Sequence, residues 1–207
     1  MYHDVYLNIF NQLYKLIEKE QPDFVVVAGD VAHTKTNISP EFVELASKFF
    51  KNIADRVKKY LIIILGNHDL NLKAKNRQDA LSPIVEALAH PKIHLQKESR
   101  ELYFPIGLYD VRMNVLSELD KEKWKFPRHP NDLNIAIYHG TINGSKVDSG
   151  FSLDMGDNPN ILYGNDYALL GDVHCQGQVL KQSWEEKFID ESELDKYLSQ
   201  GWQIDEF

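Results

Sequence analysis

Cysteine is almost absent from the sequence. Cys175 is the only one in 207 residues, so neither an intrachain disulfide framework nor a cysteine-rich zinc site can form. Long apolar runs are absent too, because runs such as Leu61–Leu65 are far too short to cross a bilayer. The first residues show no basic segment followed by an apolar core, so no secretory signal is evident. We therefore expect a soluble, cytoplasmic protein that does not associate with membranes.

Basic residues are fewer than acidic ones. The chain has 23 Lys and Arg against 31 Asp and Glu, a net charge of -8, which disfavours a mainly electrostatic nucleic-acid binder. Most of the imbalance lies in residues 185–207, which hold eight acids and two bases. Two basic stretches, Lys73–Arg77 and Lys121–Arg128, lie in the rest of the chain. The net charge therefore weakens a DNA-binding role without excluding it, and solvated loops are the alternative interpretation of both stretches.

The remaining composition, 43% hydrophobic and 26% charged, is that of a globular protein. Periodicity predicts an amphipathic helix in which Val5, Ile9, Leu13, Leu16 and Ile17 form one face. The further expected elements are a strand at 24–28, a helix starting at 39–40 with a stripe of Phe42, Leu45, Phe49 and Ile53, a strand at 61–65, a helix at about 79–89, and strands at 93–95, 102–104, 134–138 and 167–170. This alternation predicts an α/β fold with parallel strands.

The acidic tail reads as a separate strand, helix and strand over 179–184, 191–200 and 202–204. Asp190 and Glu193 form a variant capping box, and Gly201 stands where a helix C-cap belongs. We expect a main domain over 1–178 and a small appendage over 179–207. The apolar face of the tail helix would pack on the main body or, alternatively, bind a partner.

Polar clusters follow four apolar, strand-like runs. Each places glycine beside carboxylate, amide or imidazole groups, and the four are Gly29-Asp30, Gly66-Asn67-His68-Asp69, Tyr138-His139-Gly140 and Gly171-Asp172-Val173-His174. Ligands of α/β sheets bind at the carboxyl ends of strands, and glycine there lets the backbone turn tightly and approach them. One cluster alone would be an ordinary turn, but four in succession predict a shared site.

The side chains of these clusters are metal ligands by type. Carboxylate, amide and imidazole groups suit Mn²⁺, Mg²⁺, Fe or Zn²⁺. A carboxylate can bridge two ions, and two-metal sites hydrolyse phosphate esters. The four clusters together therefore predict a metal site that suits hydrolysis of phosphate esters.

In these four clusters, roughly over residues 2–178, the sequence resembles the calcineurin-like metallophosphoesterases. Gly29-Asp30-Val31-Ala32-His33 is similar to the Gly-Asp-x-x-His of the SbcD-like exonucleases of double-strand-break repair. The resemblance implies a two-sheet β-sandwich flanked by helices. It does not cover the acidic tail, whose residue pattern predicts a small β-α-β appendage. It also implies Mn²⁺ as the cofactor, with Mg²⁺ as the alternative, DNA ends or another phosphodiester as substrate, and an ATPase partner.

The resemblance assigns a role to each matching residue. Asp30 would bridge two ions; Asn67, His139 and Asp172 would hold one of them and His174 the other. His68 would be the acid at the scissile phosphate or leaving oxygen, and Asp69 would orient it. His33 is either an assisting residue at the DNA or an ordinary surface histidine.

Two departures from the family pattern matter. No Asp-x-His precedes Gly29, although the family takes two ligands of the first metal from that motif. The sequence has therefore either lost this motif or begins after the strand that carries it, and we expect one tight Mn²⁺ site and one weak one. Asp172 stands where histidine is more frequent, and its harder carboxylate favours Mn²⁺ or Mg²⁺.

Three functions stay open at this point. A DNA exo- or endonuclease is the leading interpretation. A phosphatase or cyclic-nucleotide phosphodiesterase on the same fold is the second, because fold alone does not fix the substrate. The third is a catalytically impaired domain that binds DNA ends or a complex and keeps one metal for structure.

Overall fold

The computed structural model describes residues 2–36, 38–145, 153–172, 178–182, 185–189 and 203–204. The chain forms two compact units. The first consists of Met1–His139 and Gly164–Asp172, and the second of Gly140–Tyr163 and Val173–Phe207. The predicted division at residue 178 stays a prediction.

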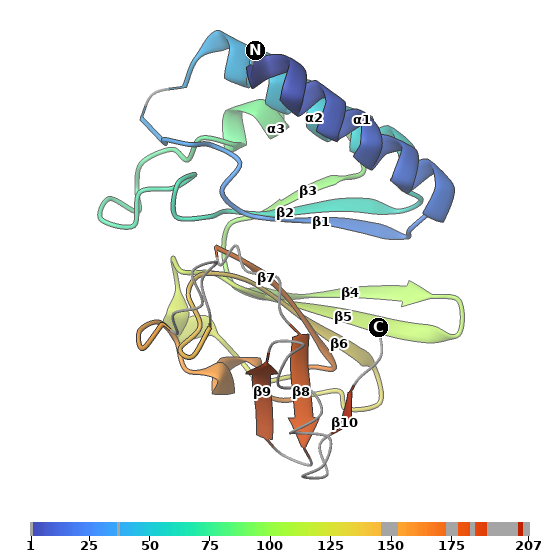
Figure 1. Cartoon of the computed structure of the whole chain (residues 1–207), viewed down its shortest axis with the longest axis vertical. Coiled ribbons are helices and arrows are strands. Elements are labelled where there is room, and N and C mark those ends of the chain that lie inside the picture. The colour runs from blue at the N-terminus through green and yellow to red at the C-terminus, as the bar shows by residue number, and fades with distance from the viewer. Residues whose placement is uncertain are drawn as a thin grey trace. The chain divides into compact units, whose positions relative to one another are not determined.

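The first sheet is parallel, in the order β1-β2-β3, with β1 at Phe24–Ala28, β2 at Tyr60–Ile64 and β3 at Ile93–Gln96 (Figure 1). Three helices cover one face of it: α1 (Tyr2–Glu20), α2 (Pro40–Arg56) and α3 (Ser82–Leu88). The core between helices and sheet contains Phe50, Ile53, Leu61 and Ile63, all fully buried. The alternation read from the sequence is therefore confirmed for this half of the chain.

Helix α2 begins as its sequence predicts. Ser39 Oγ accepts a hydrogen bond from Phe42 N at 3.2 Å, and Pro40 occupies the first turn. Its buried face is centred on Phe50 and Ile53, while Phe42 and Phe49 are only partly buried.

Helix α1 corrects the predicted apolar face. Ile17 is buried and Leu13 packs beside it, but Val5, Ile9 and Leu16 are each more than half exposed. The helix is turned so that Phe10 meets Phe49 of α2, with ring centroids 4.3 Å apart. Aromatic rings bury more apolar area than these aliphatic side chains, and both faces of α1 carry apolar residues. Periodicity alone therefore could not choose between them.

The second sheet has the order β4-β5-β6-β7, with β4 at Arg100–Ile106, β5 at Tyr109–Leu116, β6 at Leu133–His139 and β7 at Tyr167–Gly171 (Figure 1). Strands β5, β6 and β7 run parallel, and β4 pairs antiparallel with β5. Side chains of β2, β5 and β6, among them Ile62, Met113 and Ile137, form one core between the two sheets. This architecture confirms an α/β fold with two sheets. In the described part of the chain, however, all three α-helices pack against the first sheet instead of flanking both.

The second unit contains a small antiparallel sheet in the order β10-β8-β9, with β8 at Gln178–Gln182, β9 at Glu185–Ile189 and β10 at Gln203–Ile204. Strand β9 was not predicted. The predicted tail helix at 191–200, its capping residues and His174 lie outside the described residues. None of the described helices is long and apolar enough to cross a membrane.

Asp79 organises the start of α3. Its buried carboxylate accepts hydrogen bonds from Leu81 N, Ser82 N and Ser82 Oγ, and Lys97 Nζ lies 3.0 Å from it. Burial raises the pKa of this carboxyl, but the Ser82 hydrogen bonds and Lys97 outweigh burial and leave the pKa below its usual value. Helix α3 begins at Ser82, three residues later than predicted, and the Asp79 carboxylate accepts hydrogen bonds from N–H groups at its start, which have no acceptor within the helix.

We expect Asp79→Asn to lower the free energy of unfolding by about 1–2 kcal/mol at pH 7, because the amide accepts fewer charge-assisted hydrogen bonds. A carboxyl whose pKa is lowered by folding stabilises the protein above its unfolded-state pKa, and this stabilisation is lost as the pH falls through the folded-state value. Urea unfolding at pH 7 and pH 3 checks this prediction. The difference in free energy of unfolding between the variant and wild type should be smaller at pH 3 than at pH 7. The control is Glu86→Gln, on an exposed position of the same helix, which should change neither value.

Candidate metal centre

A polar residue of the candidate site lies at the end of β6 and shortly after the ends of β1, β2 and β7. Gly29, Gly66 and Gly171 allow their chains to approach closely, since a Cβ at any of them would overlap a site residue or the Ala28 carbonyl. Asp30 and Asp172 adopt left-handed backbone conformations, with φ of 54° and 85°. Such conformations cost about 1–3 kcal/mol for residues other than glycine and cluster at functional sites.

His139 is held with one ring nitrogen fixed and the other unsatisfied. Its Nδ1 lies 2.6 Å from the carbonyl oxygen of Ala28. Because a carbonyl only accepts, Nδ1 carries the proton, and the lone pair of the neutral ring is then at Nε2. Nε2 is buried and has no hydrogen-bond partner among the described residues.

Two carboxylates face that unsatisfied nitrogen. His139 Nε2 lies 3.3 Å from Asp30 Oδ2 and 3.8 Å from Asp172 Oδ1. One ligand atom from each of the three residues lies within 4.8 Å of the others. A lone pair directed at two carboxylates is repulsive unless a cation lies between them, so this donor set fits a divalent metal ion.

Asn67 extends the cluster from the end of β2. Its Nδ2 lies 3.4 Å from Asp172 Oδ1, so its amide reaches the same carboxylate that faces His139. An amide offers an oxygen as well as a nitrogen, and which of the two faces the cluster is an assignment from hydrogen bonding. The amide oxygen would add a fourth ligand of the kind that Mn²⁺ and Mg²⁺ accept.

Asp69 ties two of the site loops together. Its fully buried carboxylate accepts hydrogen bonds from Ala32 N at 2.8 Å and from Gly66 N at 2.9 Å. Burial raises its pKa, although these backbone hydrogen bonds oppose the shift. Asp69 therefore fixes the loop that carries Asp30 to the loop that carries Asn67 and His68.

His68 lies beside the cluster and is exposed. Its backbone N donates to Asp30 Oδ1 at 2.9 Å, and its Nδ1 lies 2.7 Å from the carbonyl oxygen of His33. The His33 and His68 rings are stacked with centroids 6.2 Å apart. Nδ1 therefore carries a proton, and Nε2 is the atom left to exchange a proton with a substrate.

The structure brings most of the predicted site residues together. Asp30, Asn67, His139 and Asp172 form the cluster, and His68, Asp69 and His33 adjoin it through the contacts described. His174 lies outside the described residues, and the role of each residue stays a prediction.

Sequence reasoning missed two contributors to this site. The carbonyl of Ala28 fixes His139, and a backbone group leaves no signal in the sequence. Lys35 Nζ donates to the carbonyl oxygen of Asn67 at 3.2 Å. Its position two residues after the Gly-Asp-x-x-His run was the only available hint.

Comparisons with known proteins agree with this geometry. The sequence pattern of the calcineurin-like phosphoesterase family matches residues 3–176. An uncharacterized protein of Acanthamoeba polyphaga mimivirus is 34% identical over 186 residues, which are 83% of this chain and 13% of that protein. The SbcD subunit of the nuclease SbcCD of Staphylococcus epidermidis is 29% identical over 189 residues, 80% of this chain and 50% of that protein. The chain thus spans half or less of these relatives, and it belongs to the calcineurin-like phosphoesterase family.

Proposed function

We propose that this chain is a metal-dependent phosphodiester hydrolase that acts on DNA as an exo- or endonuclease of the double-strand-break repair type. The observation that carries the proposal is the buried Nε2 of His139, which has no hydrogen-bond partner among the described residues and faces the carboxylates of Asp30 and Asp172. Family membership supports the hydrolase, and the similarity to a bacterial nuclease component supports the DNA substrate.

The proposed metal is Mn²⁺, with Mg²⁺ as the alternative. Asp30, His139, Asp172 and the Asn67 amide would hold it, and two carboxylates among four ligands favour such hard ions. When bound, a divalent ion at such a site polarises a phosphoryl oxygen and lowers the pKa of water. Asp30 and Asp172 would compensate its charge, and the Ala28 carbonyl would keep the His139 lone pair turned toward it.

His68 would handle the proton of the leaving oxygen. Its Nδ1 is engaged by the His33 carbonyl, so a proton for the substrate is carried at Nε2. The backbone bond from His68 N to Asp30 Oδ1 places this ring next to the metal ligands. Asp69 supports the arrangement through the two loops it joins, and His33 positions His68 through its carbonyl.

A catalytically impaired binding domain is the second candidate. Among these 207 residues, the resemblance assigns only Asp30 and His174 to a second ion, and a second site that binds weakly would favour this candidate. We therefore expect calorimetric titration to show one tight Mn²⁺ site and one weak site, with activity that rises at millimolar Mn²⁺. A further protein partner, by resemblance an ATPase, is part of the same proposal.

Hydrolysis of bis-p-nitrophenyl phosphate with and without Mn²⁺ tests the function. We expect activity that depends on Mn²⁺ and is abolished by EDTA, and we expect DNA with free ends to be degraded faster than phosphomonoesters are cleaved. A preference for phosphomonoesters would replace the nuclease with a phosphatase. Tight Mn²⁺ binding without hydrolysis of any ester would instead support the catalytically impaired binding domain.

A further inference from the structure

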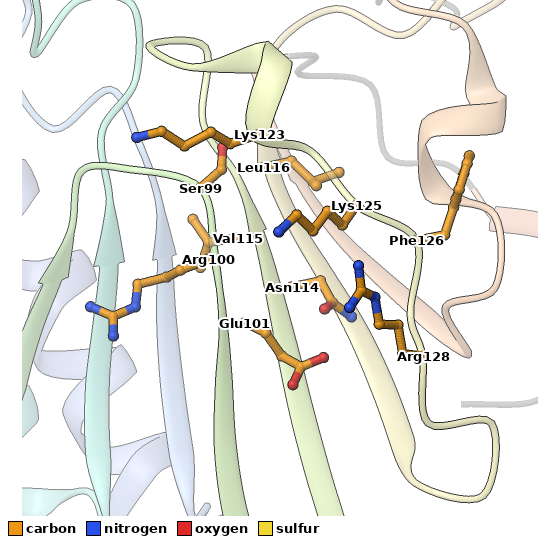
Figure 2. Close-up of a pocket in the computed structure, with 10 residues that line it drawn as sticks. All are labelled: Ser99, Arg100, Glu101, Asn114, Val115, Leu116, Lys123, Lys125, Phe126 and Arg128. Carbon is orange, nitrogen blue, oxygen red and sulfur yellow. The ribbon is translucent and has the colours of Figure 1, made fainter.

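A pocket lies in the first unit, and none of its lining residues belongs to the metal-ligand cluster. Its volume is about 290 Å³, close to the lower end of small-molecule sites. The end of β5, the start of β4 and the segment 123–128 line it (Figure 2). Residues 123–128 belong to the second basic stretch of the sequence, which the proposed function has not used.

The lining is strongly basic. Four cations line the pocket, Arg100, Lys123, Lys125 and Arg128, against one acid, Glu101. The charge of Glu101 is partly offset, because Arg112, which also pairs with Asp132, lies with its Nη1 2.5 Å from the Glu101 carboxylate. The pocket is therefore cationic in a chain whose net charge is -8.

Most of these cations have no anionic partner within the described residues. Lys123 pairs with Glu98 and Asp120. For the side chains of Arg100, Lys125 and Arg128, the described part of the chain supplies neither an ion pair nor a hydrogen bond. Like charges that gather in a hollow without acids raise the local concentration of anions.

Lys125 and Arg128 share one side of the second sheet with Asn114. Val115 packs in the core between the sheets, so Asn114 on the neighbouring position points to the opposite face. Figure 2 shows the end groups of Lys125 and Arg128 turned toward the same space as the Asn114 amide, while the Arg100 guanidinium points away from them. Asn114 Nδ2 donates to Asn165 Oδ1 at 2.7 Å, which holds the amide in place.

The segment that carries the two cations is anchored at Trp124 and at Pro127. Trp124 Nε1 donates to the carbonyl oxygen of Ser117 at 2.8 Å, and its ring meets Tyr138 edge-on with centroids 5.4 Å apart. Pro127 packs against Gly164, where an added Cβ would lie 3.3 Å from the proline ring. Lys125 and Arg128 are thus presented on a fixed backbone, so less ordering is needed when a ligand binds.

We propose that this pocket binds a backbone phosphate of the nucleic-acid strand, through Lys125 and Arg128. The pocket lies at the carboxyl edge of β5, where Leu116 is in register with Tyr138, the residue before His139. Asp172 follows β7, one strand further along the same edge, so about 10 Å of sheet width separates β5 from β7. A nucleic-acid strand whose phosphate is held in the pocket would cross this edge of the sheet to reach the metal ligands. The inference rests on the proposed function and adds to it a substrate-holding site outside the catalytic cluster.

Fluorescence anisotropy with a labelled single-stranded oligonucleotide, in EDTA, tests the site without catalysis. We expect Lys125→Gln/Arg128→Gln to weaken binding about tenfold or more at 0.1 M salt. The slope of log affinity against log salt should fall by about 0.7, since the two side chains hold one phosphate and each phosphate contact on a single strand contributes about 0.7. The control is Lys15→Gln, which removes one charge from an exposed position of α1 and should leave both quantities unchanged.

Hydrolysis of bis-p-nitrophenyl phosphate separates this proposal from the function on which it rests. The small ester does not need the pocket, so the double variant should hydrolyse it at the wild-type rate while its oligonucleotide binding falls. The pocket assignment would be overturned if the double variant bound the oligonucleotide as tightly as wild type does. It would also be overturned if the wild-type protein did not bind the oligonucleotide at all. Both outcomes count whether or not the ester is hydrolysed. Inorganic phosphate that binds the wild type as tightly as the oligonucleotide would also overturn it, in favour of a free anion. Near-ultraviolet circular dichroism confirms that the variant is folded.

Discussion

Asp30→Asn is expected to remove tight Mn²⁺ binding and to lower hydrolysis of bis-p-nitrophenyl phosphate by on the order of 10³-fold, because metal stabilisation of transition-state charge is worth several kcal/mol. Asp30 faces His139 Nε2, accepts a hydrogen bond from the backbone of His68 and, by resemblance, bridges two ions. Asparagine can still accept the His68 hydrogen bond, so the loop should keep its shape. Calorimetry and initial rates measure the two effects.

A stability measurement gives the same variant a readout besides activity. Without metal, the carboxylates of Asp30 and Asp172 repel each other, so the neutral amide of the Asp30→Asn variant should leave the protein as stable as wild type or more stable by about 1 kcal/mol. With Mn²⁺ present, wild type should gain stability by mass action and the variant should not. Asp154→Asn, an exposed substitution of the same kind, should behave as wild type throughout. If the Asp30→Asn variant bound Mn²⁺ as tightly as wild type, Asp30 would not be a metal ligand.

Strands β1 and β2 were predictable because the side chains on both of their faces pack against apolar clusters. Runs such as Phe24–Ala28 and Leu61–Leu65 are apolar throughout and end in glycine and polar residues, which is typical of parallel strands. Strand β5 escaped prediction because it alternates, with Val111, Met113 and Val115 facing the core and polar residues between them. Its period of two was visible in the sequence and could have identified it.

The site was predictable as a set of residues but less so as a geometry. The clusters indicated that Asp30, Asn67, His139 and Asp172 would meet, since each follows a strand and ligands of α/β folds bind at the carboxyl ends of strands. They did not indicate that β1 and β2 belong to one sheet and β6 and β7 to the other. The partners of Asp69 were not predictable. Its carboxylate reaches Ala32, 37 residues earlier, and a contact of that separation depends on how the two loops fold together. Whether Asp69 also orients His68 stays a prediction.

His68→Ala is expected to slow DNA hydrolysis by roughly 10²–10⁴-fold while Mn²⁺ occupancy barely changes. Alanine keeps the backbone N–H that donates to Asp30 Oδ1, so the substitution removes the ring and leaves the metal ligands in place. A proton donor matters most for a poor leaving group, and the sugar hydroxyl of DNA is a far poorer one than p-nitrophenol. The loss on bis-p-nitrophenyl phosphate should therefore be much smaller than the loss on DNA, a difference that a purely structural role would not produce. Rates on both substrates and elemental analysis of bound metal measure this, with His90→Ala as the control, since His90 pairs with Asp55 on α2. Equal losses on the two substrates, or loss of metal together with activity, would show that His68 holds the site together and does not supply the proton.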